Sequence, residues 1–145
     1  MEPKKEKEII SRKLYNKILK GIELQDIYYV TGKFSIVREA LSPNSKIKIT
    51  KNAKFDVLSK NFVRLSHTYK LHVINKESKK RCINIECAFG LDLQSNEEFT
   101  EEFFEVFKEI NLPINTWPFF REYVFNITSK MNIPPLTLPL LQSIF

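Results

Sequence analysis

The chain of 145 residues is long enough for one domain with a hydrophobic core of its own. Apolar residues make up 43% and charged residues 28% of the chain, a balance that excludes a disordered or membrane-spanning protein. The net charge is +6, but residues 1–20 hold seven Lys or Arg and three Glu and so account for +4 of it. Because the other 125 residues carry a net charge of only +2, the charge distribution argues against nucleic acid as a partner of the folded body.

The sequence also indicates the cellular compartment. No uninterrupted apolar run reaches the roughly 18 residues of a transmembrane helix, and MEPKKEKEIISRKL lacks the apolar core of a signal peptide. Cys82 and Cys87 are five residues apart on one expected strand, so they point to opposite faces and do not readily form a mutual disulfide. We therefore expect a cytoplasmic protein without membrane insertion.

The N-terminal segment reads as a basic extension, residues 1–21, ahead of a domain that spans residues 22–145. Ile10, Leu14 and Ile18 recur at helical spacing among lysines, and Gly21 follows as a stop signal. The pattern predicts a short amphipathic helix over residues 6–20. It is compatible with packing on the body, with binding a fixed partner, and with a frayed tail.

Residues 22–93 change to a two-residue period, which predicts four strands in an antiparallel meander. Gly32 interrupts the first strand and indicates a bulge or a bend there. The third strand alternates most clearly, with one apolar and one polar face. The apolar face holds Val63, Leu65, Tyr69, Leu71 and Val73, and the polar face holds Arg64, Ser66, Thr68, Lys70 and His72. The fourth strand places Ile83, Ile85, Cys87, Phe89, Leu91 and Leu93 on its inner face.

Two helices are expected after the sheet. Ser95 and Glu98 form a capping-box pattern before an apolar stripe with glutamates on the opposite side, and Pro113 is expected to end this first helix. The second begins near Thr116 and carries more aromatic side chains than one face can bury. The fold class is therefore α+β, a four-stranded antiparallel sheet with two helices packed on one face and an extra N-terminal amphipathic helix.

The chain after Lys130 has no charged residue, and prolines at 134, 135 and 139 forbid a continued helix. We expect an extended tail that lies on apolar surface of its own or a neighbouring subunit.

Catalytic patterns are missing from the sequence. With Gly only at 21, 32 and 90, no phosphate-cradling loop can form, and the cysteines and histidines do not have zinc-ligand spacing. Cys87 and His67 would need a third orienting group to act as a nucleophile pair, and both point into the packed side of the sheet. We therefore expect neither an enzyme nor a metal or cofactor site, but a protein whose aromatic surplus contacts a partner.

The chain resembles the SecB family of protein-export chaperones. The resemblance lies in the order of a four-stranded sheet and an acidic-aromatic helix, followed by the C-terminal segments WPFFREYVFNITSKMNIPPLTLPLL and SIF. Trp117, Pro118 and Phe119 match the family's aromatic-Pro-aromatic phrase, and Arg121 and Glu122 match its Arg-Glu pair. The resemblance implies a homotetramer assembled as a dimer of dimers, and ATP-independent holding of unfolded client polypeptides in apolar grooves.

The groove that the resemblance implies lies between the second strand with its following loop and the second helix. The expected client-binding residues are Ile47, Ile49, Phe55, Val57, Phe62, Tyr123 and Phe125. For each of them, core packing or subunit burial is the competing explanation.

The chain departs from the family in its charge. Members that dock on the translocation motor SecA present carboxylates on the exposed sheet face, whereas this chain has Lys33, Arg38, Arg64 and Lys70 at outward positions. This disfavours SecA as a partner and suits relatives that serve toxin-antitoxin modules by protecting an antitoxin. General export and antitoxin protection both stay open, as does a non-chaperone adaptor that binds a fixed partner through its N-terminal helix.

Overall fold

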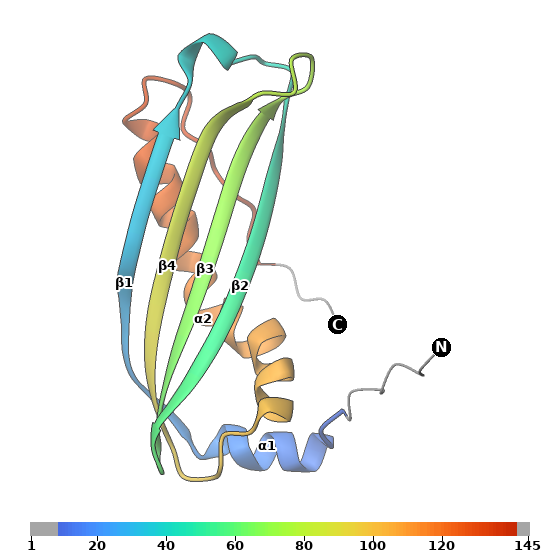
Figure 1. Cartoon of the computed structure of the whole chain (residues 1–145), viewed down its shortest axis with the longest axis vertical. Helices are drawn as coiled ribbons and strands as arrows, with labels where there is room; N and C mark the ends of the chain where they lie inside the picture. Colours follow the sequence, from blue (N-terminus) through green and yellow to red (C-terminus); the bar gives the residue numbers. More distant parts are fainter. Residues whose placement is uncertain (1–8, 142–145) are drawn as a thin grey trace.

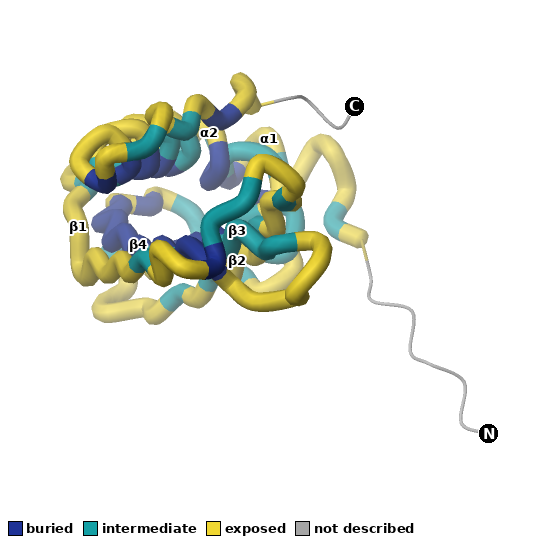
Figure 2. The backbone as a smooth tube through the Cα atoms, turned by 90° about the horizontal axis from the view of Figure 1, so that it is seen from above, coloured by how far each residue is buried: buried dark blue, intermediate teal, exposed yellow. Residues whose placement is uncertain are grey.

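The computed structural model describes residues 9–141. The first eight residues of the basic extension and the final SIF lie outside this range. The elements in chain order are α1 (Arg12–Lys20), β1 (Ile22–Ile36), η1 (Arg38–Ala40), β2 (Ser45–Ser59), β3 (Phe62–Asn75), β4 (Arg81–Ser95) and α2 (Glu101–Ser129). The sheet and α2 form two layers with the buried residues between them (Figure 2). The expected α+β class with a four-stranded antiparallel sheet is confirmed.

The strand order is β1-β4-β3-β2, so the sheet is not a simple meander (Figure 1). β2, β3 and β4 follow one another as neighbours, but β1 pairs with β4 along its length, and the chain crosses the end of the sheet through η1 to reach β2. The burial of β4 explains this order. Almost every residue from Cys82 to Leu93 is buried, which requires a neighbouring strand on both edges. Within residues 9–141, the outer edges of β1 and β2 have no strand partner.

The alternation expected for the third and fourth strands is confirmed, because the apolar sets of both face α2. β1 is less regular and shifts register between Leu24 and Asp26 and between Tyr29 and Thr31. The second shift lies beside Gly32, where the sequence indicated a bulge. A Cβ atom at Gly32 would lie 2.6 Å from the hydroxyl of Tyr123, so the glycine also lets α2 approach β1 closely.

The two helices expected after the sheet are one continuous helix, α2, and the expectation that Pro113 ends the first was wrong. A proline removes one backbone hydrogen bond and bends a helix without ending it when neighbouring groups compensate. The bond that Pro113 removes is the one to the carbonyl of Glu109. In the same turns, Asn115 Nδ2 donates to the carbonyl of Asn111 at 2.8 Å and Thr116 Oγ1 to that of Leu112 at 3.2 Å. Figure 1 shows the resulting change of direction in the middle of α2.

The capping box expected at Ser95 and Glu98 was also wrong. The N-cap of α2 is Thr100, whose hydroxyl accepts a hydrogen bond from the backbone N–H of Phe103 at 3.1 Å. Ser95 instead donates to the carbonyl of Glu97 at 2.7 Å and closes the turn out of β4.

The expected N-terminal helix is present as α1, and it packs on the body. Ile18 is buried, and the ring of Tyr15 stacks on Phe103 with 4.9 Å between the ring centroids. The Tyr15 hydroxyl hydrogen-bonds the side-chain oxygen of Asn111. α1 thus covers the N-terminal half of α2 with its apolar side, which leaves less of that side to hold a separate partner.

The tail after α2 turns back and runs along the protein surface. Asn132 has a positive φ of 56°, a conformation that asparagine tolerates better than most residues. Leu138 is buried, its carbonyl accepts a hydrogen bond from Arg121 Nε at 2.9 Å, and Trp117 Nε1 donates to the carbonyl of Pro139 at 3.0 Å. The tail therefore lies on apolar surface of its own subunit.

Candidate functional site

An apolar groove of ≈ 530 Å³ lies where the tail passes the edge of the sheet near η1. One wall is formed by the loop after η1 and the first residues of β2, including Leu41, Pro43 and Ile47. The other wall is the tail segment at residues 133, 134 and 136, and Val73 and Ile83 contribute from the sheet. The groove thus joins three segments that are distant in sequence and presents almost only aliphatic side chains and proline.

The loop wall of the groove is held by two hydrogen bonds. Asn75 Nδ2 donates to the carbonyl of Ala40 at 3.0 Å, and the backbone N–H of Lys76 donates to the carbonyl of Asn44 at 2.9 Å. These two bonds tie the β1–β2 connection to the β3–β4 turn, so this wall is positioned by the sheet.

The tail wall is held by α2. The backbone N–H of Leu136 donates to the buried hydroxyl of Thr128 at 2.8 Å, and that hydroxyl itself donates to the carbonyl of Val124 at 2.8 Å. Both walls are therefore fixed in the absence of an occupant, which reduces the conformational entropy lost on binding.

The structure separates the seven residues that the sequence grouped as client-binding. Ile47 lines the groove and Ile49 follows on the same face of β2, half-buried against the core. Phe55 packs on the rings of Phe99 and Phe104, with centroids 5.1 and 4.6 Å apart.

The other four candidates lie elsewhere. Val57 is exposed near the far end of β2, and Phe62 occupies a register position on the outer face of the sheet. Tyr123 contacts Tyr29 at the β1 edge, with 5.9 Å between the ring centroids. Phe125 is exposed in a small pocket beside the tail.

The sequence pattern did not indicate the tail as the second wall of the groove. The uncharged, proline-rich composition of residues 131–141 predicted that the tail lies on an apolar surface, but it did not indicate which surface. The contribution of Val73 and Ile83 was also missed, because both read as ordinary core residues of their strands.

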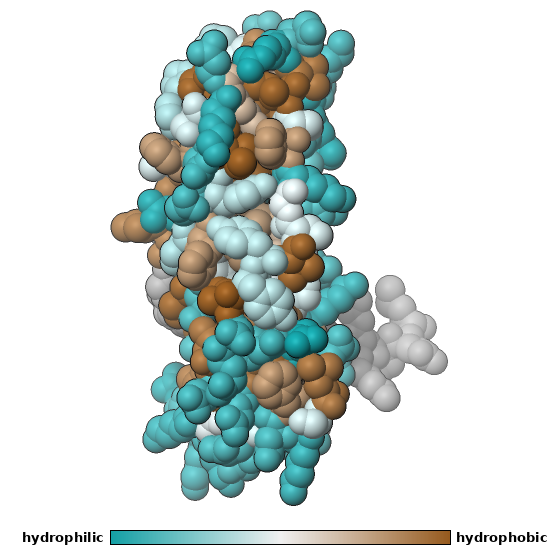
Figure 3. Space-filling view, turned by 90° about the vertical axis from the view of Figure 1, so that its left-hand side faces the viewer, coloured by the Kyte–Doolittle hydropathy of each residue, from teal (hydrophilic) through white to brown (hydrophobic). Residues whose placement is uncertain are grey.

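A second apolar surface follows the β1 edge. The inward-facing side chains of Leu24, Tyr29 and Phe34, all on the edge strand β1, are 42%, 47% and 57% exposed. Phe119 and Phe125 add exposed aromatic rings from α2. Figure 3 shows this side of the molecule, with apolar side chains spread among polar ones along its length.

The buried titratable groups are structural. His67 Nδ1 lies 2.8 Å from Thr116 Oγ1 in the core, and burial, with a smaller contribution from Lys51, lowers the pKa of His67 to about 4. Burial raises the pKa of the Cys87 thiol to about 12, which leaves no thiolate near neutral pH. A Cys87–His67 nucleophile pair is not supported, since β3 register sets Tyr69 and not His67 opposite Cys87.

The described residues contain neither a metal-binding cluster nor a membrane-spanning helix. No cluster of three His, Cys, Asp or Glu side chains in that part of the chain could hold a metal ion. Between residues 9 and 141 there is also no helix long and apolar enough to cross a membrane.

The sheet order, the single bent helix and the returning tail define a SecB-like fold. The SecB-like chaperone Rv1957 of Mycobacterium tuberculosis, solved in complex with a ChAD peptide from the antitoxin HigA1 (Rv1956), shares this fold with a TM-score of 0.75. The match covers 92% of this chain and all of that one at 15% sequence identity. At this identity the likeness establishes the fold, and function has to be argued from the surfaces.

A more distant match is a protein of unknown function from Streptococcus agalactiae, with a TM-score of 0.42 and 11% identity over 82% of this chain and 97% of that one. No protein-family model and no curated protein matches the sequence.

Proposed function

We propose that this protein is an ATP-independent SecB-like chaperone that holds unfolded or aggregation-prone polypeptides, and that it is not an enzyme. The observation that carries the proposal is the preformed apolar groove beside an unpaired strand edge. β2 is the last strand of the sheet, and its outer edge makes no backbone hydrogen bond in the described part of the chain. An unfolded segment can bury alternate side chains in the groove and pair its backbone with β2.

This mode of binding tolerates many sequences. Apolar burial contributes about 25 cal/mol per Å² without directional requirements, and backbone pairing reads no side chain. Ile47, Leu41 and Pro134 are the contact residues that we propose in the groove, with Ile49 behind them. Phe55, Val57 and Phe62 extend the same strand and stay candidates for a longer client, whereas Tyr123 and Phe125 would contact one only at the β1 side.

We propose antitoxin protection as the specific role, in the cytoplasm. The structural neighbour Rv1957 was solved with an antitoxin peptide, and the basic outward residues of this chain do not suit a motor surface such as SecA that binds acidic SecB faces. General support of export is the competing role.

Self-assembly through β1 is part of the proposal. The half-exposed Leu24, Tyr29 and Phe34 lie beside an unpaired strand edge, so a second subunit can bury them and continue the sheet. Two such dimers would give the dimer of dimers implied by the SecB resemblance.

The test is suppression of aggregation by the purified protein without nucleotide. A denatured client is diluted into buffer with an equimolar amount of subunits, and light scattering is followed. We expect slower aggregation, and we expect Ile47→Asp to abolish the effect, because a carboxylate in the groove would be desolvated by the client.

Leu58→Asp is the matched control. Leu58 is also on β2 and is 50% exposed against 46% for Ile47, but it lies outside the groove. The proposal fails if wild-type protein does not slow aggregation of any client, or if both variants lose the activity equally.

A further inference from the structure

The outer face of the sheet, which faces away from α2, is divided by charge. Its half toward η1 carries five exposed cations and one carboxylate, Glu86. The cations are Lys33, Lys46, Lys48, Lys70 and Arg81, and we call this region the basic half-face. The half toward α1 holds the acidic residues Glu23, Asp26, Asp56 and Asp92, with Lys54 and Arg64. Small residues such as Ala88 and Thr68 separate the two halves.

Most cations of the basic half-face are uncompensated. Lys70 lies 4.0 Å from Glu86, and both side chains are partly exposed, so this pair contributes little. Among residues 9–141, Lys33, Lys46, Lys48 and Arg81 form no ion pair at all. Lys46 and Lys48 are neighbours on the same face of β2, about 7 Å apart along the strand, so they repel each other until an anion binds.

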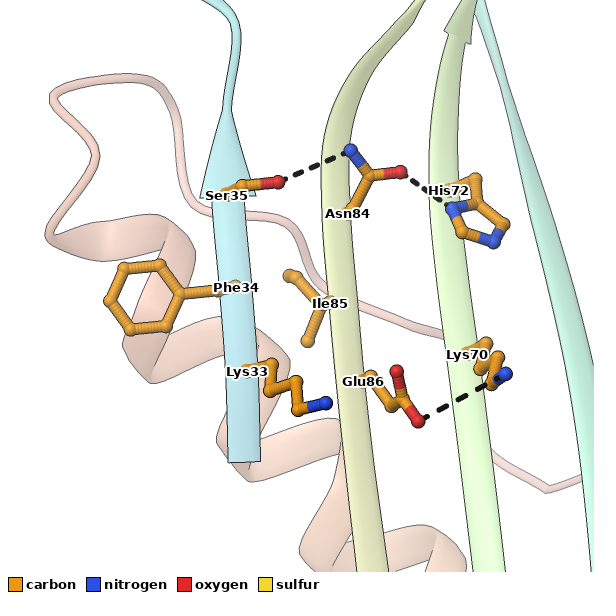
Figure 4. A pocket seen from close by; sticks show the side chains of 8 residues that line it. All are labelled: Lys33, Phe34, Ser35, Lys70, His72, Asn84, Ile85 and Glu86. Carbon is orange, nitrogen blue, oxygen red and sulfur yellow. Dashed lines mark hydrogen bonds and ion pairs between the residues drawn. The ribbon is translucent and has the colours of Figure 1, made fainter. Parts of the chain in front are cut away.

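A polar row crosses the basic half-face within a shallow depression of ≈ 320 Å³ (Figure 4). Asn84 Nδ2 donates to Ser35 Oγ at 3.2 Å, so the Asn84 Oδ1 atom accepts from His72 Nδ1 at 2.7 Å. The Ser35 hydroxyl, which accepts in this row, keeps its own hydrogen to donate. A ligand in the depression therefore meets a hydroxyl donor on β1 and, on the same surface, the ammonium groups of Lys33 and Lys70.

We propose that the basic half-face is a docking surface for a short acidic polypeptide segment, extended and rich in Asp or Glu. Three strand spacings make the surface about 14 Å wide, which is the length of four or five extended residues. Carboxylates at alternate positions of such a segment reach lysines on β1 and on β2 while its backbone lies over the polar row.

The charge division favours a short acidic peptide over nucleic acid. A nucleic acid strand carries a phosphate at every step and would continue from the basic half-face onto Asp26, Asp56 and Asp92. The outward positions of the basic half-face also hold no Phe, Tyr or Trp side chain on which a base could stack. This surface lies on the opposite side of the sheet from the client groove, so it goes beyond the proposed chaperone activity and can be tested separately.

The experiment measures fluorescence anisotropy of a labelled peptide of alternating Glu and Ser with the intact protein at about 100 mM salt, where exposed charges still interact over about 10 Å. A single-stranded oligonucleotide of equal charge is titrated in parallel. We expect the peptide to bind, with affinity reduced roughly tenfold or more in the double variant Lys46→Glu/Lys48→Glu.

The double variant Lys54→Glu/Lys60→Glu is the matched control, since it makes the same charge change at exposed positions of β2 and its turn outside the basic half-face. It should change peptide affinity less than about threefold. Absence of peptide binding to the wild type, an equal loss in both variants, or tighter binding of the oligonucleotide would each overturn the proposal. Suppression of client aggregation by Lys46→Glu/Lys48→Glu should be unchanged, which separates this surface from the groove.

Discussion

Thr116 Oγ1 lies 2.8 Å from the hydroxyl of Tyr69 and 2.8 Å from His67 Nδ1, so one hydroxyl on α2 satisfies two buried polar groups of β3. Thr116 lies between the two prolines of α2, and its hydroxyl also bonds the carbonyl of Leu112. The bend of the helix is thus fixed to the sheet by a hydrogen-bonded cluster inside the core.

Replacing Thr116 with Val should destabilise the protein by roughly 2–4 kcal/mol, because the isosteric side chain leaves both His67 and Tyr69 without a partner in a buried site. Urea unfolding followed by circular dichroism measures the change. Thr50→Val on the exposed face of β2 is the control and should cost less than about 0.5 kcal/mol. Equal effects of the two variants would mean that the cluster does not hold α2 to the sheet.

Acid should weaken the fold through His67. Its pKa in the folded protein is about 4, below the ordinary value of 6.5, so protons bind the unfolded chain more strongly. The stabilising contribution of neutral His67 is complete above pH 6.5 and is lost as the pH falls toward 4, at a cost of roughly 3 kcal/mol. Urea midpoints between these pH values should fall more steeply for wild type than for His67→Gln, and parallel curves would contradict this assignment.

Gly90→Ala should destabilise the sheet by roughly 1–3 kcal/mol, because a Cβ atom there would clash with the ring of Tyr28. Displacing the ring also breaks the hydrogen bond from the Tyr28 hydroxyl to Asp92, which spans 3.1 Å. A double-mutant cycle with Tyr28→Ala separates the causes. The glycine substitution should cost much less in the Tyr28→Ala background, and an undiminished cost would place the strain in the backbone.

Leu138→Ala should cost roughly 2–4 kcal/mol, since Leu138 is buried and anchors the tail on α2. Leu140→Ala, at an exposed position two residues on, should change stability by less than about 0.5 kcal/mol. Loss of the anchor should also speed amide hydrogen exchange at Leu136, whose N–H bonds Thr128 in the wild type. Unchanged exchange there would show that the tail wall of the groove does not depend on Leu138.

Sequence periodicity and stop signals predicted those elements whose structure depends mainly on neighbouring residues in the chain. The faces of β3 and β4 follow from the two-residue period, and α1 follows from helical spacing and a glycine stop. The position of β1 beside β4 was not predictable in this way, because it depends on how fully β4 is buried in the finished sheet. The continuity of α2 through Pro113 was missed because a proline within a helical pattern is an ordinary stop signal, and the sequence does not show that packing on the sheet carries the helix past it.

The candidate site was predictable only in part. Ile47 could be named because the groove implied by the resemblance to the SecB family has the second strand as one wall. The facing wall could not be named, because a proline-rich tail without charge carries no signal for the surface on which it folds back. The resemblance assigned Tyr123 to the wall opposite β2, whereas the structure places it over Gly32 and Tyr29 of β1.

The most direct test of the central claim, that clients bind in the apolar groove, is site-specific photo-crosslinking to an unfolded client. A photoreactive phenylalanine analogue replaces Ile47 in the groove or, as a control, Asn52 on the outer face of the same strand. We expect client adducts from position 47 and few or none from position 52, with the former competed away by an unlabelled unfolded polypeptide. Equal crosslinking from both positions, or none from position 47 while aggregation is still suppressed, would contradict the claim.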